Sequence, residues 1–176
     1  MTDFISVGSR RQIDPVSIEG IANKHPLVAI AAATSMPDPY FGEVLVMYVV
    51  VESGKSCVPE EVDRHLAVSI MDASARPKAI FIVDELPTTA VGAIDRGALR
   101  LDAVARAARS AMMALAAATN AWMEVETGGV PPALKVTVLS SKSDRNALRQ
   151  AIAAILDRYP LPYEIHFAKS ANRDPA

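Results

Sequence analysis

The sequence predicts an α/β chain with small mixed sheets flanked by helices, and three observations lead to that class. Hydrophobic residues make up 51% of the chain, enough to bury a core. Apolar runs of strand length alternate with stretches of helical period. The order helix, strand, strand, helix, strand occurs twice in 176 residues. We therefore expect two regions, 1–100 and 101–176, the second a candidate degenerate repeat of the first. The alternative is unrelated halves, because this order is common in α/β proteins.

Turn residues separate the expected elements of the first region. We expect an extended stretch (3–12) with a turn at Gly8, and then a helix (15–24) and two strands (27–34 and 44–51). A second helix that begins at Ser56 or Cys57 and a third strand (79–83) follow. Pro15 suits a first helical turn, and the residue before Pro26 avoids the α region, which ends that helix. The run 44–51 is apolar at every position, which predicts a strand buried on both faces.

The second region is expected to repeat that order. Its elements are a long helix (95–119), two strands (122–126 and 134–139), a helix (144–158) and a last strand (163–167). The long helix follows from its many alanines, with Gly97 as a candidate break. Asp144 suits an N-cap, and Ala147, Ile152 and Ile155 are expected on the buried face of the helix that follows.

Charge and composition exclude several classes of function. The chain has 18 basic and 20 acidic residues, so it offers no basic footprint and we expect no nucleic-acid partner. Its apolar runs are shorter than the roughly 20 residues that a membrane span needs, so no membrane partner is expected. The single cysteine, Cys57, excludes an internal disulfide, and the N-terminus lacks the pattern of a signal peptide. We expect a cytoplasmic protein.

Residues that often carry chemistry are scattered. His25, His65 and His166 lie in different expected elements, and Cys57 has no second cysteine within zinc spacing. We therefore expect no metal and no bound cofactor, and Cys57 is interpreted as a small apolar residue. The run 53–56 is similar to the end of a phosphate-binding loop, but Val49 stands where that loop needs its first glycine, so a plain turn is expected.

The most informative stretch is the loop of residues 84–96. It is rich in threonine and contains Gly92, so backbone amides and hydroxyls at Thr88 and Thr89 could approach an anionic ligand. The stretch resembles the closing motif "deLPrTatGKidrxxLr" of the adenylate-forming enzymes, the acyl-CoA synthetases and their relatives. The matching positions are Pro87, Thr89, Gly92, Ile94, Asp95, Leu99 and Arg100.

Four further motifs of the same family occur upstream in the right order. They are "DxIKxGG" at Asp3, Ile5 and Gly8; "IxPxEIE" at Ile13, Pro15, Ile18 and Glu19; "HPxV" at 25–28; and "PDxxxGE" at Pro37, Asp38, Gly42 and Glu43. Together they cover about residues 3–100 and resemble the small C-terminal lid domain of that family. The large domain that holds ATP and the carboxylate substrate has no counterpart here, so the resemblance implies a free-standing lid.

The resemblance also implies that lysine positions of the family carry other residues in this chain. Members of the family form an acyl-adenylate and then rotate the lid so that a thiol can attack. A lysine in the motif's "GK" pair bridges the carboxylate and the nucleotide, and Ala93 occupies that position here. Ser6 and Ala75 stand at two other lysine positions, whereas Pro77 is retained. Since a methyl group cannot stabilise an oxyanion, no catalytic residue is expected.

Three functions stay open at this point. The preferred expectation is a degenerate lid that acts as an interaction or auxiliary module, with an adenylation-domain protein or a second copy of itself as partner. The alternative is the C-terminal component of a split acyl-CoA or carrier-protein ligase, because loss of the lysine affects adenylation more than thiol transfer. The third is a sensor that binds AMP, ATP or acyl-CoA weakly at Thr88, Thr89, Gly92 and Ala93. No ligase activity of the chain alone is expected.

Overall fold

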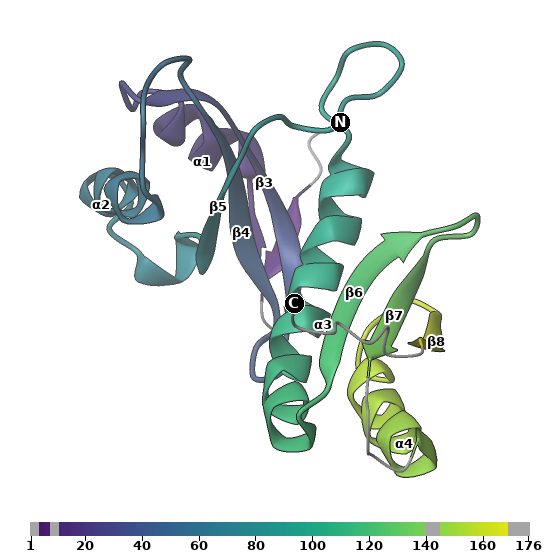
Figure 1. Cartoon of the computed structure of the whole chain (residues 1–176). Helices are drawn as coiled ribbons and strands as arrows, with labels where there is room; N and C mark the ends of the chain where they lie inside the picture. Colours follow the sequence, from purple (N-terminus) through teal and green to yellow (C-terminus); the bar gives the residue numbers. More distant parts are fainter. Residues whose placement is uncertain (1–3, 8–10, 140–144, 169–176) are drawn as a thin grey trace, which may run out of the picture. The chain divides into compact units, whose positions relative to one another are not determined.

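The computed structural model describes residues 4–7, 11–139 and 145–168 of the chain. It confirms a mixed α/β fold with small sheets flanked by helices (Figure 1). The chain forms two compact units, residues 1–103 and residues 104–176. The boundary between them lies within helix α3 (Arg96–Thr119), whose first part belongs to one unit and whose second part belongs to the other.

The first unit is built on a three-stranded sheet with the order β3-β4-β5. Its elements are β1 (Ile5–Val7), β2 (Arg11–Ile13), α1 (Pro15–Ala22), β3 (Val28–Asp38), β4 (Gly42–Val51), α2 (Pro59–Ser69), a short 3-10 turn (Ala73–Ala75) and β5 (Ala79–Val83). β3 and β4 are antiparallel, whereas β4 and β5 are parallel. β1 and β2 form a separate antiparallel hairpin.

Helices cover both faces of this sheet, which confirms that β4 is buried on both sides. On one face, α1 and α2 pack against the strands through Ile18, Val62 and Leu66. On the other face, Leu99 and Ala103 of α3 pack against β3 and β4. The Tyr48 hydroxyl of β4 also donates to Asp102 Oδ2 of α3 at 2.7 Å. α3 is therefore held on the sheet by apolar packing and by a hydrogen bond.

Side-chain caps decide where the helices begin. Asp14 accepts from Val16 N at 3.1 Å, so α1 starts at Pro15 as expected. Glu61 accepts from Val58 N at 2.9 Å, which fixes the start of α2 at Pro59, beyond the expected start at Ser56 or Cys57. Asp95 accepts from Ala98 N at 3.0 Å, and α3 runs through Gly97 without the break that its glycine suggested.

The second unit has the same sheet topology as the first. Besides the later part of α3, it contains β6 (Trp122–Gly128), β7 (Ala133–Leu139), α4 (Arg145–Leu156) and β8 (Tyr163–Ala168). The order is β6-β7-β8, with an antiparallel pair followed by a parallel pair. The internal repeat stays a prediction, which this shared topology supports. Asp144, the expected cap of α4, lies outside the described residues.

Burial in the second unit differs from burial in the first. Along β7, Leu134, Val136 and Val138 are buried by α3 and α4, whereas the side chains between them are more exposed. The opposite side of the sheet, which we call the open face, carries Trp122, Glu124, Glu126, Lys135, Thr137, Leu139, Glu164, His166 and Ala168. This sheet therefore buries one side only.

Two further details of the sequence expectation were wrong. β3 continues to Asp38, beyond the expected end of this strand at Thr34, because Asp38 still pairs with Gly42 of β4. α4 buries Leu148, Ile152 and Leu156 at four-residue spacing, so Ala147 is exposed.

Within residues 4–7, 11–139 and 145–168, no helix combines the length and apolar character that a membrane crossing requires.

Candidate functional site

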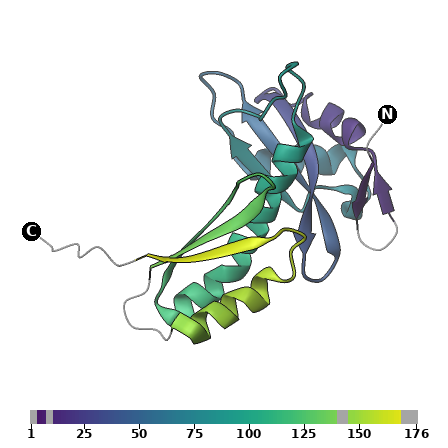
Figure 2. The same cartoon turned by 90° about the vertical axis from the view of Figure 1, so that its right-hand side faces the viewer.

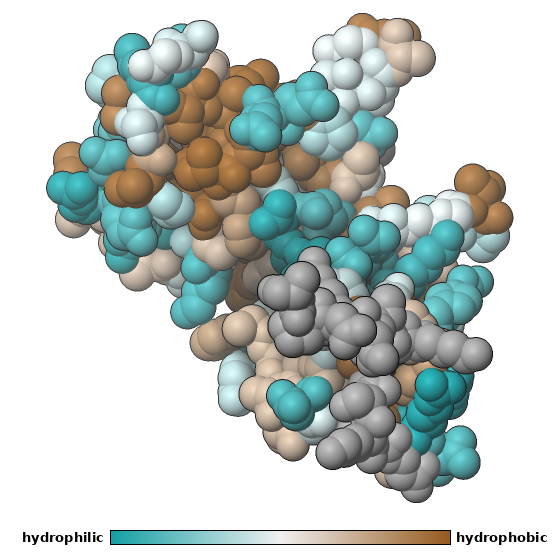
Figure 3. All heavy atoms as spheres, in the orientation of Figure 1, coloured by the Kyte–Doolittle hydropathy of each residue, from teal (hydrophilic) through white to brown (hydrophobic). Residues whose placement is uncertain are grey.

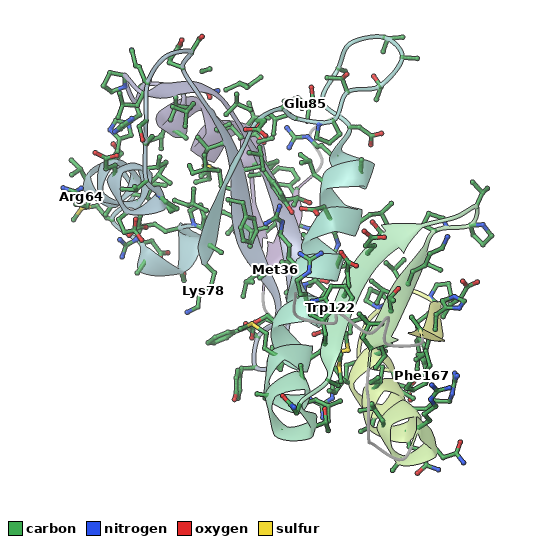
Figure 4. All side chains as sticks on the ribbon, viewed as in Figure 1. Met36, Arg64, Lys78, Glu85, Trp122 and Phe167 are labelled. Atoms are coloured by element: carbon green, nitrogen blue, oxygen red, sulfur yellow. The ribbon has the colours of Figure 1, made fainter. Side chains whose placement is uncertain are left out.

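The loop of residues 84–95 joins β5 to α3 and folds back on itself as a small closed turn. Three backbone hydrogen bonds hold it: Asp95 N donates to Pro87 O at 2.8 Å, Thr89 N to Ala93 O at 2.7 Å and Gly92 N to Thr89 O at 2.9 Å. Thr88 and Ile94 form an isolated bridge across its neck. Residues 88–93 are exposed, and Figure 4 shows the loop projecting beyond the labelled Glu85. The loop is thus an ordered projection.

Gly92 is required by the backbone of this loop. Its φ of +79° lies in the left-handed region, which L side chains rarely adopt. A Cβ at this position would meet no atom within 4 Å, so space is not the constraint. The glycine of the loop motif is therefore retained for conformational reasons.

An ion pair anchors the C-terminal end of the loop. Arg96, the first residue of α3, binds the Glu19 carboxylate of α1 at both oxygens, with Nη1–Oε1 at 2.7 Å and Nη2–Oε2 at 2.9 Å. β3 joins the network, because Ala33 N donates to Glu19 Oε1 at 2.7 Å and Ala33 O accepts from Arg96 Nη1 at 2.9 Å. The Glu19 side chain is only 9% exposed. This bidentate geometry fixes α1, β3 and α3 together at the base of the loop.

A second ion pair ties α3 to the β3–β4 hairpin. The Arg100 guanidinium binds Glu43 through Nη2 and donates from Nη1 to Ser35 O at 2.9 Å. Glu43 Oε2 is buried and has no hydrogen-bond partner among the described residues. Glu19 and Glu43, both found as motif positions in the sequence, therefore hold the scaffold of the loop in place.

The remaining motif residues of the hairpin shape its turn. Asp38 Oδ1 accepts from Tyr40 N at 2.8 Å and from Phe41 N at 2.9 Å, and Gly42 has a φ of +75°. This turn presents Tyr40 (89% exposed) and Phe41 (56% exposed) to solvent. Sequence reasoning missed this aromatic pair, although two adjacent aromatics inside a Pro–Gly turn are a readable signal. Lys78 Nζ lies 5.3 Å from the centre of the Phe41 ring.

The expected ligand-facing residues come together at the tip of the loop. Thr88, Thr89, Gly92 and Ala93 all lie in its exposed part. Residues 84–95 include three carboxylates and no lysine or arginine, so the loop itself supplies no positive charge. Ser6 lies in β1 and Ala75 in the 3-10 turn. Asp3 and Gly8 lie outside the described residues.

A pocket of about 380 Å³ lies near the base of the loop and not at its tip. β1, α1, β3, β4 and α3 all contribute to its wall. Ser6 lines it together with Thr34, Glu43, Arg96 and Arg100. The lining carboxylate and the two guanidiniums belong to the ion pairs above, which limits their capacity to bind a further charged group.

Other chemistry-bearing residues do not form a site of their own. His25 and His65, far apart in sequence, have ring centres 5.1 Å apart in an edge-on contact. Burial raises the pKa of the Cys57 thiol, and the neighbouring Glu61 carboxylate raises it further, so a reactive thiolate is disfavoured. Among residues 4–7, 11–139 and 145–168, no three His, Cys, Asp or Glu side chains are placed to hold a metal ion.

Comparisons with known proteins agree on one region. Residues 17–93 match the family described as "AMP-binding enzyme C-terminal domain". The chain is 37% identical over 103 residues to a marinolic acid–CoA ligase of Pseudoalteromonas sp. and 39% identical over 98 residues to an acetyl-coenzyme A synthetase of Deinococcus radiodurans. These matches cover 58% and 56% of this chain, but only 16% and 15% of the relatives.

Solved structures show the same partial overlap. An acyl-CoA synthetase of Brucella canis aligns with a TM-score of 0.50 and 35% identity, and apo MatB of Rhodopseudomonas palustris with a TM-score of 0.53 and 26% identity. Each alignment covers 56% of this chain, and 18% and 19% of the respective neighbour. The chain thus spans less than a fifth of the length of these proteins.

Proposed function

We propose that this chain, in which residues 17–93 form an acyl-CoA synthetase-like AMP-binding enzyme C-terminal domain, is an auxiliary module that docks on an adenylation domain without contributing to adenylation. The observation that carries this proposal is the loop of residues 84–95. Its three closing hydrogen bonds and its Arg96–Glu19 anchor hold an ordered projection, yet its tip bears the methyl group of Ala93.

Electrostatics explains why such a tip cannot assist adenylation. Attack of a carboxylate on the α-phosphate of ATP brings anionic groups together, and catalysis needs fixed positive charge or aligned donors there. A methyl group offers neither. The carboxylates of Asp84, Glu85 and Asp95 make the segment net negative, which opposes binding of an anion at the tip. A role in docking has no such requirement, because it depends on shape and on the anchored scaffold.

A second candidate, assistance of thioester formation, is favoured by the exposed aromatic pair. Tyr40 and Phe41 are exposed aromatic rings, the second with Lys78 Nζ over one face, and a planar heterocycle such as the adenine of coenzyme A can stack on rings of this kind. Asp38 orders the turn that carries them, so little conformational freedom would be lost on binding. Replacing Tyr40 and Phe41 by serine would then weaken coenzyme A binding about tenfold, whereas docking on the adenylation domain would be unchanged.

The test uses the large domain of the Deinococcus radiodurans acetyl-coenzyme A synthetase, made without its own C-terminal domain. Titration calorimetry of the 176-residue chain with this domain measures docking, and ATP–pyrophosphate exchange measures adenylation. We expect saturable binding with no gain in exchange. The Ala93→Lys variant should raise exchange by the mixture at least tenfold, because it restores one fixed charge at the tip, and should give none by itself.

Two results would contradict the proposal. The first is an unmodified chain that accelerates exchange as well as Ala93→Lys does, since the missing charge would then be irrelevant. The second is an absence of binding to this domain and to the large domain of a second relative, the marinolic acid–CoA ligase. Ala90→Lys is the matched control, because it adds the same charge to an exposed neighbouring position of the loop.

A further inference from the structure

β8 ends the sheet of the second unit with an uncovered edge. It pairs with β7 in parallel from Tyr163 to Ala168, and no other described strand lies beyond it (Figure 2). The outer edge of such a strand presents backbone N–H and C=O groups that another strand can bind. Many proteins block such edges with prolines or inward-pointing charges, but here Tyr163, Ile165 and Phe167 face the apolar side of the sheet.

The side chains of β8 are complementary to those of a second β8 in antiparallel orientation. With Ile165 opposite Ile165 of a second copy, each Glu164 stands opposite His166 of the other strand. Glu164 and His166 both lie on the open face, with side chains 57% and 63% exposed, and within one chain His166 Nε2 lies 3.3 Å from Glu164 Oε2. Pairing of two copies would exchange this contact within each strand for two contacts between strands. On the other face the same register sets Tyr163 opposite Phe167, an aromatic pair. Every cross-strand pair in this register is thus favourable or apolar.

Only one register has this property. A shift by two residues in one direction sets Glu164 against Glu164, and a shift in the other direction sets His166 against His166. Odd shifts are excluded, because they bring residues of opposite faces together. The pairing of Glu164 with His166 therefore specifies the register around Ile165 and disfavours the registers shifted by two residues.

The other edge strand of this sheet lacks such complementarity. β6 carries Glu124 and Glu126 on its open face, so antiparallel self-pairing about Val125 sets glutamate against glutamate. Shifts by two residues leave one of these residues opposite its own copy. The Val125 carbonyl also accepts from Arg109 Nη2 of α3 at 2.6 Å. Charge thus distinguishes the two edges and selects β8.

We propose that two copies of this chain associate through their β8 edges, forming a continuous six-stranded sheet with a twofold axis at Ile165. The partner is a second copy of this chain, because the pattern of β8 is complementary to itself. This interface is independent of the function proposed for residues 17–93, and the experiments below involve neither ATP nor coenzyme A.

Sedimentation equilibrium of the complete chain across micromolar concentrations tests the proposal. We expect a monomer–dimer equilibrium. Because two symmetric Glu164–His166 pairs are lost at once, His166→Glu and Glu164→His should each raise the dimer dissociation constant about tenfold. The combined variant, with both residues exchanged, should return it to near the original value. Glu124→Gln on β6 is the matched control: it changes an exposed glutamate of the other edge strand without making that edge complementary to itself, and should leave association unchanged.

Hydrogen exchange provides a measurement that needs no variant. Backbone amides of β8 should exchange more slowly as the concentration of the unmodified chain rises, whereas those of β6 should not. A chain that stays monomeric, a dimer indifferent to both single substitutions, a combined variant as weak as the single ones, or protection at β6 in place of β8 would each overturn the proposal.

Discussion

Removal of the Arg96 guanidinium should destabilise the first unit strongly. In Arg96→Ala, Glu19 loses two charge-assisted hydrogen bonds, at 2.7 and 2.9 Å, and of its bonds to described residues it keeps the one from Ala33 N. Such bonds contribute about 1.5–3 kcal/mol each, but the Arg96 side chain is 34% exposed, so water replaces part of the loss. Because the Glu19 carboxylate stays buried without its partner, we expect a cost of about 3 kcal/mol.

Urea unfolding followed by far-ultraviolet circular dichroism measures this cost, with hydrogen exchange at the Ala33 amide reporting on the first unit. Arg64→Ala is the matched control: this arginine is exposed on α2 and donates to Glu60 O at 3.2 Å, so its removal should cost less than about 0.5 kcal/mol. In a double-mutant cycle with Glu19→Gln, the combined loss should be smaller than the sum of the single losses. An Arg96→Ala cost below about 1 kcal/mol, or strict additivity, would refute the role given to this pair.

Three further predictions concern the loop, the cysteine and a tyrosine. Gly92→Ala should cost about 1–2 kcal/mol in urea unfolding because of its positive φ, whereas Gly20→Ala in α1 should stabilise by about 0.5–1 kcal/mol; equal effects would contradict the argument. Cys57, 8% exposed and with a raised thiol pKa, should react with Ellman's reagent at pH 7 far more slowly than after denaturation. The Tyr163 hydroxyl donates to Asp157 Oδ1 at 2.8 Å, and this bond raises the pKa of Tyr163. That raised pKa contributes stability below the ordinary pKa of tyrosine, and the contribution is lost as pH rises through the folded value. Asp157→Asn should therefore lower the pKa of Tyr163 in ultraviolet titration, and no change would exclude the bond as its cause.

Local sequence patterns were sufficient to predict most of the helices and strands of the fold. The run at 44–51 was correctly expected as a strand buried on both faces, because only a strand covered on two sides tolerates apolar residues at every position. Helix starts were less predictable when a cap came from further along the chain. Glu61 fixes the start of α2 by binding back to Val58, and propensity alone placed that start too early. Periodicity also selected Ala147 over Leu148 in α4, because spacing does not say which of two adjacent apolar residues faces the sheet.

The candidate site was predictable only in part. The resemblance selected Glu19, Glu43, Arg100 and the loop residues, but the pairing of Glu19 with Arg96 and of Glu43 with Arg100 emerges only from the fold. The Tyr40–Phe41 pair was missed because it occupies variable positions of the motif, so that only the adjacency of two aromatic residues in a turn indicated it. The contact between the rings of His25 and His65 was equally invisible, since it depends on how α2 packs beside the end of α1.

The one-sided burial of the second sheet divides its positions into those that tolerate substitution and those that do not. Figure 3 shows hydrophilic residues, in teal, on the visible surface of the second unit. Substitutions at Leu134, Val136 or Val138 would leave cavities, so selection for folding restricts them. Exposed positions on the opposite side, such as Glu124 and Lys135, can exchange charge at little energetic cost. Related chains could therefore diverge in binding preference at this sheet while their cores stay the same, and a deep mutational scan should find tolerated and intolerant positions alternating along β7.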